Sequence, residues 1–111
     1  MPDIPSPNEF KYIPHTLAET VNMMNSPNYK ERFLAEYFQV WLRLEKLNAM
    51  LEKWDKGQLE FTPTCPQTVL IAQSNAMATY LTILHQRLQI EIPEFKEVVE
   101  ILLKNFGQRD D

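Results

Sequence analysis

The residues best suited to binding chemistry lie in one charged and aromatic segment, "YKERFLAEYFQVWLRLEKL", at residues 29–47. On a helix that turns about 100° per residue, one arc of this segment carries polar side chains spaced by three or four residues. These side chains are Tyr29, Arg32, Glu36, Gln39, Arg43 and Lys46. Arginine offers phosphate a planar fork of donors, and a tyrosine ring stacks on a base. The arc fits two interpretations, a strip that binds an anion or a solvated helix face with an Arg32–Glu36 ion pair.

A second segment adds Tyr80 and Arg87, which are seven residues apart and share a helix face. Residues 27–90 hold seven Lys or Arg residues against six Asp or Glu residues, although the whole chain has a formal net charge of −4. The negative charge therefore lies in the flanks. This distribution leaves room for a local cationic site, whereas the acidic total disfavours DNA, whose binders depend on phosphate contacts.

The sequence has no pattern typical of catalysis or of a metal site. It contains no glycine-rich phosphate loop and no GxSxG, HExxH or CxxC motif. His15 and His85 lie in different segments without a carboxylate at ligand spacing, and Cys65 is the single cysteine. We therefore expect a protein that is not an enzyme and that has no metal, no cofactor and no disulfide within the chain.

No apolar run in the 111 residues approaches the 18 residues that a membrane helix requires, and no apolar signal segment follows the N-terminus. We expect no membrane partner and a cytoplasmic location.

Apolar periodicity predicts an all-α fold, a single domain built on an antiparallel hairpin of two long helices. The helices are expected at about 28–56 and at about 67–90. The first begins either at Ser26 with Pro27 or at Asn28 with Glu31, and it ends at the stop signal Gly57. Residues 1–26 form an N-terminal arm and a short helix from about Thr16, residues 27–91 form the hairpin core, and residues 92–111 form a C-terminal helix and tail.

The two long helices share a seam of apolar residues that recur in alternating steps of four and three, as in a coiled coil. It comprises Phe33, Tyr37, Val40, Leu44, Leu47, Leu51 and Trp54 in the first helix, and Leu70, Ser74, Met77, Leu81, Leu84 and Leu88 in the second. Leu34, Phe38 and Trp41 fall outside this seam and need a second partner. That partner is either the chain's own arm or last helix, or another subunit at an oligomer interface.

Residues 28–91 resemble a family of small phage-encoded proteins related to a crAss-like phage protein. They also resemble the helical-hairpin domain of phage anti-CBASS and anti-Thoeris sponge proteins. The resemblance is carried by Tyr29-Lys30-Glu31-Arg32, Glu36-Tyr37, Arg43-Leu44-Glu45-Lys46-Leu47, Ala76-Met77, Tyr80-Leu81 and Arg87.

This resemblance implies a sponge that sequesters a cyclic di- or trinucleotide, or a related signalling nucleotide, and so blocks host defence without catalysis. It implies a homo-oligomer, which in such sponges is often a hexamer, in the cytoplasm of the infected bacterial host. Arg32, Arg43 and Lys46 are then expected to bind phosphates, and Tyr29 and Tyr80 to contact bases, with Arg87 beside Tyr80. The alternative is a helical interaction module, an inhibitor or adaptor that binds a host protein through Leu34, Phe38 and Trp41.

Overall fold

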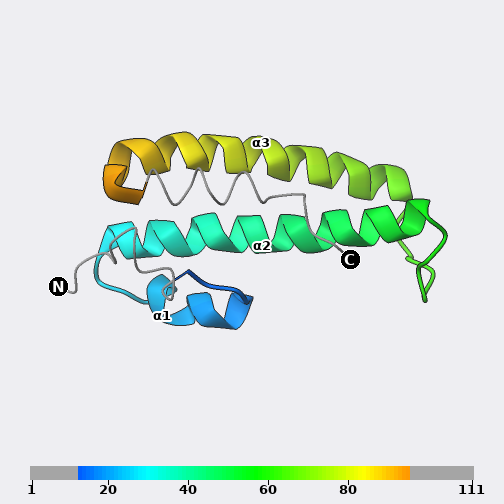
Figure 1. Ribbon diagram of the computed structural model, residues 1–111, viewed down its shortest axis with the longest axis horizontal. Helices are drawn as coiled ribbons and strands as arrows, with labels where there is room; N and C mark the ends of the chain where they lie inside the picture. The colour runs from blue at the N-terminus through cyan, green and yellow to red at the C-terminus, as the bar shows by residue number, and fades with distance from the viewer. Residues whose placement is uncertain (1–12, 96–111) are drawn as a thin grey trace.

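The computed structural model describes residues 13–95, and every regular element within them is a helix (Figure 1). The elements are η2 (Leu17–Thr20), α1 (Val21–Met24), α2 (Tyr29–Asp55), α3 (Gln67–Glu91) and η3 (Pro93–Phe95). α2 and α3 run antiparallel side by side, and α1 packs on α2 on the side away from α3. The all-α fold with two long packed helices is therefore confirmed. Residues 1–12 of the expected N-terminal arm lie outside the described residues. So does the C-terminal helix and tail expected at 92–111, apart from Ile92 and the turn at Pro93–Phe95.

Local signals in the sequence determine where α2 begins and ends. The Asn28 side chain accepts a hydrogen bond from the Lys30 N–H at 3.0 Å, which satisfies one of the free donors of the first turn. At the other end Gly57 adopts a φ of 70°, its N–H donates to the Trp54 carbonyl, and the Gln58 N–H donates to the Lys53 carbonyl. This pair of bonds is the Schellman motif, which glycine favours because it has no Cβ.

The predicted short helix at 16–25 is divided into η2 and α1. The Thr16 hydroxyl accepts a hydrogen bond from the Glu19 N–H at 3.3 Å, and the Glu19 carboxylate accepts one from the His15 N–H at 2.6 Å. These reciprocal bonds resemble a capping box. They begin the helical segment where the sequence predicted it.

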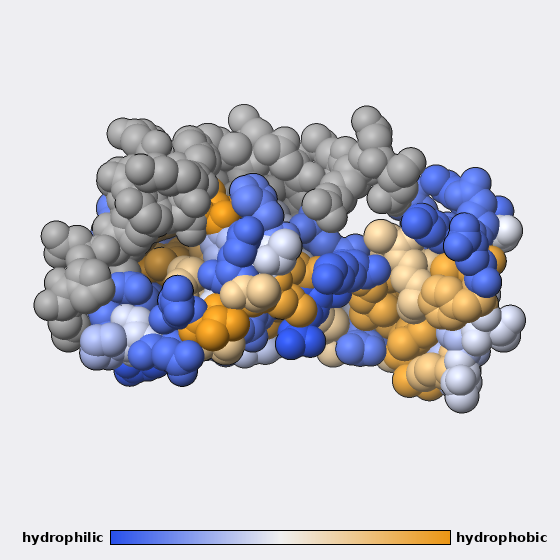
Figure 2. Space-filling view, turned by 90° about the horizontal axis from the view of Figure 1, so that it is seen from below, coloured by the Kyte–Doolittle hydropathy of each residue, from blue (hydrophilic) through white to orange (hydrophobic). Residues whose placement is uncertain are grey.

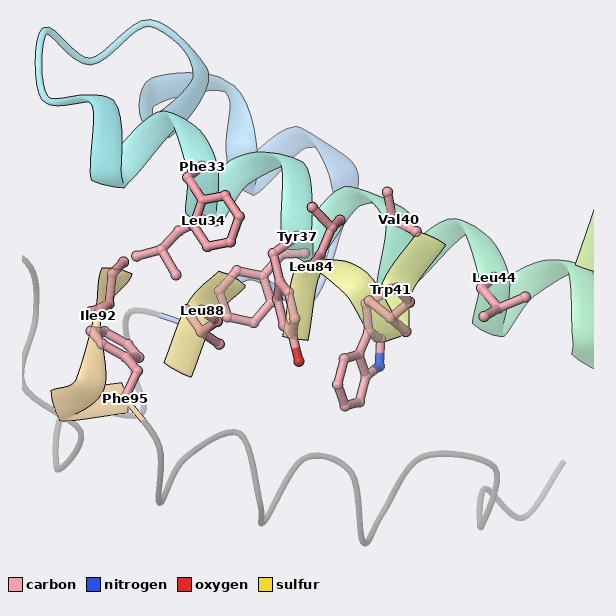
Figure 3. Packing of buried hydrophobic residues seen from close by; sticks show 12 residues of the cluster. Phe33, Leu34, Tyr37, Val40, Trp41, Leu44, Leu84, Leu88, Ile92 and Phe95 are labelled. Carbon is pink, nitrogen blue, oxygen red and sulfur yellow. The ribbon is translucent and has the colours of Figure 1, made fainter. Parts of the chain in front are cut away.

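The hydrophobic core lies at one end of the hairpin (Figure 3). The seam is buried at Phe33, Tyr37, Val40 and Leu44 on α2 and at Leu81, Leu84 and Leu88 on α3. The remaining seam positions, from Leu47 to Trp54 and from Leu70 to Met77, are only partly buried. A polar contact replaces apolar packing there, since the Ser74 hydroxyl donates to the Asn48 side chain at 2.5 Å. The predicted seam residues thus lie between the two helices, but only those at one end of the hairpin are fully buried.

The second apolar stripe of α2 belongs to the same core. Leu34, Phe38 and Trp41 are only 1%, 5% and 5% exposed, and they cluster with Ile92 and Phe95. The structure thus places them inside the chain rather than on a surface open to another molecule. The expected interface at these three residues is corrected to the intrachain alternative.

Tyr37 is the largest fully buried side chain of the core, and its hydroxyl has no hydrogen-bond partner within the described part of the chain. Its ring meets Phe38 edge-on at a centroid distance of 5.4 Å. Burial raises the pKa of Tyr37 far above its ordinary value, because the charged form loses its water.

We predict that Tyr37→Phe raises the free energy of unfolding by about 1 kcal/mol, because it removes a buried hydroxyl without a partner and keeps the ring. Urea unfolding at pH 7 measures this change. In the parent chain the unfolded state loses the Tyr37 proton first as pH rises. The contribution of Tyr37 to the free energy of unfolding is therefore fully present below a pH of about 10 and is lost progressively above it. The free energy of unfolding of Tyr37→Phe should fall less over that range. An equal fall in both chains would contradict the raised pKa of buried Tyr37.

Candidate anion-binding groove

An open groove of about 390 Å³ lies along α2, with Met24 of α1 on one side and Tyr80 of α3 on the other. It is lined by Met24, Arg32, Glu36, Gln39, Val40, Arg43 and Tyr80. α2 supplies five of these residues at spacings of one to four along one side of the helix, as the sequence arc predicted. The volume falls at the lower end of the range for small-molecule sites, about 300–1,000 Å³.

Two arginines give the groove its cationic character. Arg32 is held in place because its Nη1 donates to the Ser26 carbonyl at 2.7 Å. Arg43, by contrast, makes no ion pair or hydrogen bond with any residue from 13 to 95 and is exposed. With Glu36 as the single acid among the lining residues, the groove has a formal charge of +1 in a chain of net charge −4. Arg43 is therefore the donor most available to an anion.

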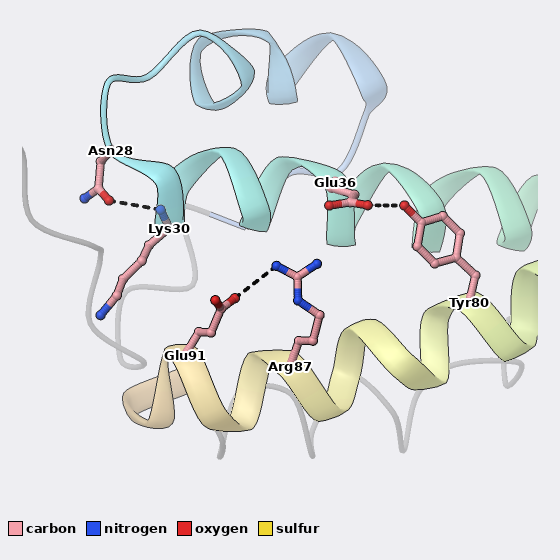
Figure 4. A network of polar contacts seen from close by, with 6 residues as sticks. All are labelled: Asn28, Lys30, Glu36, Tyr80, Arg87 and Glu91. Carbon is pink, nitrogen blue, oxygen red and sulfur yellow. Dashed lines mark hydrogen bonds and ion pairs between the residues drawn. The ribbon is translucent and has the colours of Figure 1, made fainter.

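Tyr80 of α3 connects the two long helices across the groove. Its hydroxyl donates a hydrogen bond to the Glu36 carboxylate of α2 (Figure 4). This bond raises the pKa of Tyr80 above its ordinary value, with burial and the negative charge of Glu36 adding to the effect. Glu36 is thereby occupied by Tyr80 rather than left as a bare repulsive charge.

Gln39 holds the segment of η2 and α1 in place beside the groove. Its side-chain N–H donates to the Thr20 hydroxyl at 2.9 Å, and that hydroxyl donates to the Leu17 carbonyl at 2.7 Å. Because Thr20 is fully buried, this chain of bonds holds the turn before α1 against the middle of α2. Met24 reaches the groove as a result.

The structure brings together three of the six sequence-predicted binding residues, Arg32, Arg43 and Tyr80. Tyr29 lies one turn before Arg32 and is 53% exposed, and Lys46 lies almost one turn beyond Arg43 and is exposed. These two extend the strip at both ends without lining the groove.

Arg87 has a different environment. Its guanidinium lies over the Phe33 ring at 4.5 Å from the centroid. It also pairs with Glu91 of the same helix at 3.3 Å (Figure 4). The contact with Phe33 of α2 places Arg87 at the seam between α2 and α3, where it covers the end of the core. Arg87 is not among the residues that line the groove.

Sequence reasoning did not include Met24, Glu36, Gln39 and Val40 among the binding residues. Glu36 and Gln39 belong to the polar arc of the sequence, and their helical spacing from Arg32 and Arg43 is the signal that predicts them beside these residues. Met24 had no such signal, since it enters the groove through the packing of α1 on α2.

The described residues contain no group of three His, Cys, Asp or Glu side chains that could hold a metal ion. Among the same residues, no helix has the length and apolar character needed to cross a membrane.

The fold is an all-helical hairpin with a small open groove whose lining has a positive formal charge. The family model named Sequestin matches residues 27–90, which span both long helices and their connecting loop, and the chain belongs to this family. The family name is compatible with a protein that sequesters a ligand. Comparisons with curated proteins and with solved structures gave no match.

We predict that Glu36→Gln lowers the pKa of Tyr80 toward its ordinary value near 10, because the charged acceptor that stabilises the neutral phenol is lost. NMR titration of the tyrosine Cζ signals measures the change residue by residue. Tyr37, whose pKa is raised by burial alone, is an internal control that should not move. A Tyr80 pKa unaffected by the substitution would contradict the hydrogen bond to Glu36.

Proposed function

We propose that this chain is a phage-encoded sponge that binds and sequesters a cyclic di- or trinucleotide, or a related signalling nucleotide, and so keeps a host defence effector silent. The observation that carries the proposal is the groove, in which two arginines face the same open space as a tyrosine ring. Membership of the Sequestin family supports sequestration.

The chemistry of the lining suits a nucleotide better than a simple anion. The fork of Arg43 is available for a phosphate, and Arg32 brings a second positive charge from one side of the same helix. Tyr80 offers a ring 42% exposed for contact with a base, and Met24 and Val40 supply apolar surface. Tyr29 and Lys46 continue the same strip, so a ligand with more than one phosphate has further groups within reach along α2.

The runner-up, a module that binds a host protein through Leu34, Phe38 and Trp41, loses its supporting observation because these residues are buried in the chain's own core. Sequestration requires affinity alone, so the proposal gives the groove no bond-breaking step.

Isothermal titration against a panel of cyclic di- and trinucleotides tests the proposal. We expect at least one ligand to bind, and Arg43→Ala to weaken that ligand by about 10- to 100-fold, the usual worth of a hydrogen bond to a charged group. Lys53→Ala is the matched control, because it removes an exposed positive charge from the last turn of α2, outside the groove. No binding tighter than about 10 μM to any member of the panel would overturn the proposal.

The charge balance of the groove gives a second prediction. Glu36→Gln raises the formal charge of the lining from +1 to +2. An anionic ligand should then bind about fivefold more tightly at low salt, with the gain reduced at higher ionic strength, since charges near a surface are worth about 1 kcal/mol and are screened. Weaker binding in this variant would show that Glu36 contacts the ligand as an acceptor.

A further inference from the structure

The side-chain amide of Gln39 is held in one orientation beside the groove. Its nitrogen donates to the Thr20 hydroxyl at 2.9 Å and also to the sulfur of Met24. The Thr20 hydroxyl has a single proton, which it donates to the Leu17 carbonyl at 2.7 Å, so towards Gln39 it can only accept. The thioether sulfur of Met24 is likewise an acceptor, although a weak one. Both neighbours therefore require the nitrogen of the amide, and not its oxygen, on the side of α1.

The amide oxygen of Gln39 is consequently the polar atom that this side chain leaves for a ligand. Gln39 is half-buried and lines the groove, and its oxygen accepts no hydrogen bond from any residue between 13 and 95. The groove thus contains a hydrogen-bond acceptor whose orientation is fixed before any ligand arrives.

Charge along α2 divides the groove into zones. Arg32, Glu36, Gln39 and Arg43 lie within an arc of about 60° on the helix, in that order along its axis. Gln39 lies about 10 Å along the axis from Arg32 and about 6 Å from Arg43. The arginines therefore lie on either side of two acceptors, the Glu36 carboxylate and the Gln39 oxygen. A phosphate is attracted to the arginines and repelled by the acceptors, so the middle of the groove suits an uncharged donor.

We infer that Gln39 selects nucleotides whose base carries an exocyclic amino group, by accepting a hydrogen bond from that group. The inference rests on the proposed function, because it names the kind of base that the proposed nucleotide carries. Glutamine pairs with adenine through both atoms of its amide in other proteins, but here the nitrogen is already occupied. Tyr80 lines the same groove from α3, so its ring can stack on a base whose edge meets Gln39.

An acceptor of fixed orientation discriminates between bases more sharply than between sugars. An amino group only donates a hydrogen bond and a keto group only accepts one, so a keto group at the same position would place two acceptors against each other. A ribose hydroxyl both donates and accepts, and it can therefore satisfy either end of an amide. The fixed orientation of Gln39 thus points to the base as the group that it recognises.

Thr20 is then a positioning residue, which acts on the ligand only through Gln39. It is fully buried, and it prevents the amide from turning its nitrogen towards the groove. Without the Thr20 hydroxyl, the weak Met24 acceptor alone would hold the nitrogen. The amide would then present either N–H or C=O to a ligand, and a keto base would bind as well.

Isothermal titration of the full chain with cyclic di-AMP and cyclic di-IMP tests the inference. The second compound has a keto group where adenine carries its amino group, and both have the same charge. We expect cyclic di-AMP to bind about three- to tenfold more tightly, which is the worth of one neutral hydrogen bond. Gln39→Met keeps the length of the side chain without the amide, so the ratio of the two affinities should fall to about one.

Thr20→Val should also lower the ratio, through tighter binding of cyclic di-IMP. A merely structural role of Thr20 would weaken both ligands alike and leave the ratio unchanged, which would overturn the positioning role. Gln67→Met is the matched control, because it removes an amide whose nitrogen donates to Asp55 at 2.8 Å outside the groove. Its ratio should equal that of the parent chain. Circular dichroism checks that each variant stays folded.

Equal affinities of the parent chain for the two compounds, or a ratio unaffected by Gln39→Met, overturn the inference. The 2′-deoxy analogue of cyclic di-AMP separates base from sugar. If Gln39→Met abolished a preference for ribose over deoxyribose instead, the donor would belong to the sugar and the assignment to the base would be wrong. Binding of neither cyclic di-AMP nor cyclic di-IMP also overturns the inference, while binding of another nucleotide of the panel would leave the proposed function standing. Failure of the proposed function itself appears as no binding by any nucleotide.

Discussion

Burial of the first half of α2 is the constraint on which the rest of the structure depends. The eight buried residues of this helix all lie between Phe33 and Leu44, and they point in more than one direction. One neighbouring helix cannot cover such a surface, because a packed helix covers only one stripe of its partner. α3 covers the seam, and the segment of η2 and α1 lies along another side of α2. The groove lies along α2 between these neighbours, so packing on two sides of one helix brings Met24 and Tyr80 to the same site.

Helix boundaries were predictable because their signals are local. Asn28 and Gly57 each act within a few residues. The helix begins after Asn28, one of the two starts that the sequence offered, and ends before Gly57 as predicted. The depth of packing did not follow from the seam itself, because the seam from Leu47 to Trp54 has the same apolar spacing as the seam from Phe33 to Leu44. The residues beside the seam carry the difference, since Leu34, Phe38 and Trp41 of the first half are followed by Glu45, Asn48 and Glu52 in the second. Hydrophobic side chains consequently reach the surface near the loop end of the molecule (Figure 2), where Phe61 is 58% exposed.

The candidate site shows the same division between local and tertiary information. Helical spacing placed Arg32 and Arg43 on one side of α2, and the structure has them in one groove. Spacing could not distinguish an arginine that faces a groove from one that covers an aromatic ring, as Arg87 covers Phe33. The bond between Tyr80 and Glu36 joins residues 44 positions apart, so it depends on the register of the hairpin. Because packing of the core sets that register, it also sets the position of Tyr80 opposite Glu36.

The two long helices contribute unequally to the groove. α2 carries ten charged residues in 27 and supplies both arginines of the lining, while α3 carries only Arg87 and Glu91 among its 25 residues and supplies Tyr80. The groove therefore takes its positive charge from one helix and its aromatic ring from the other, and the bond between Tyr80 and Glu36 joins the two. A ligand that contacts both the arginines and the ring would depend on the register of the hairpin, whereas a ligand that contacts the arginines alone would depend only on α2.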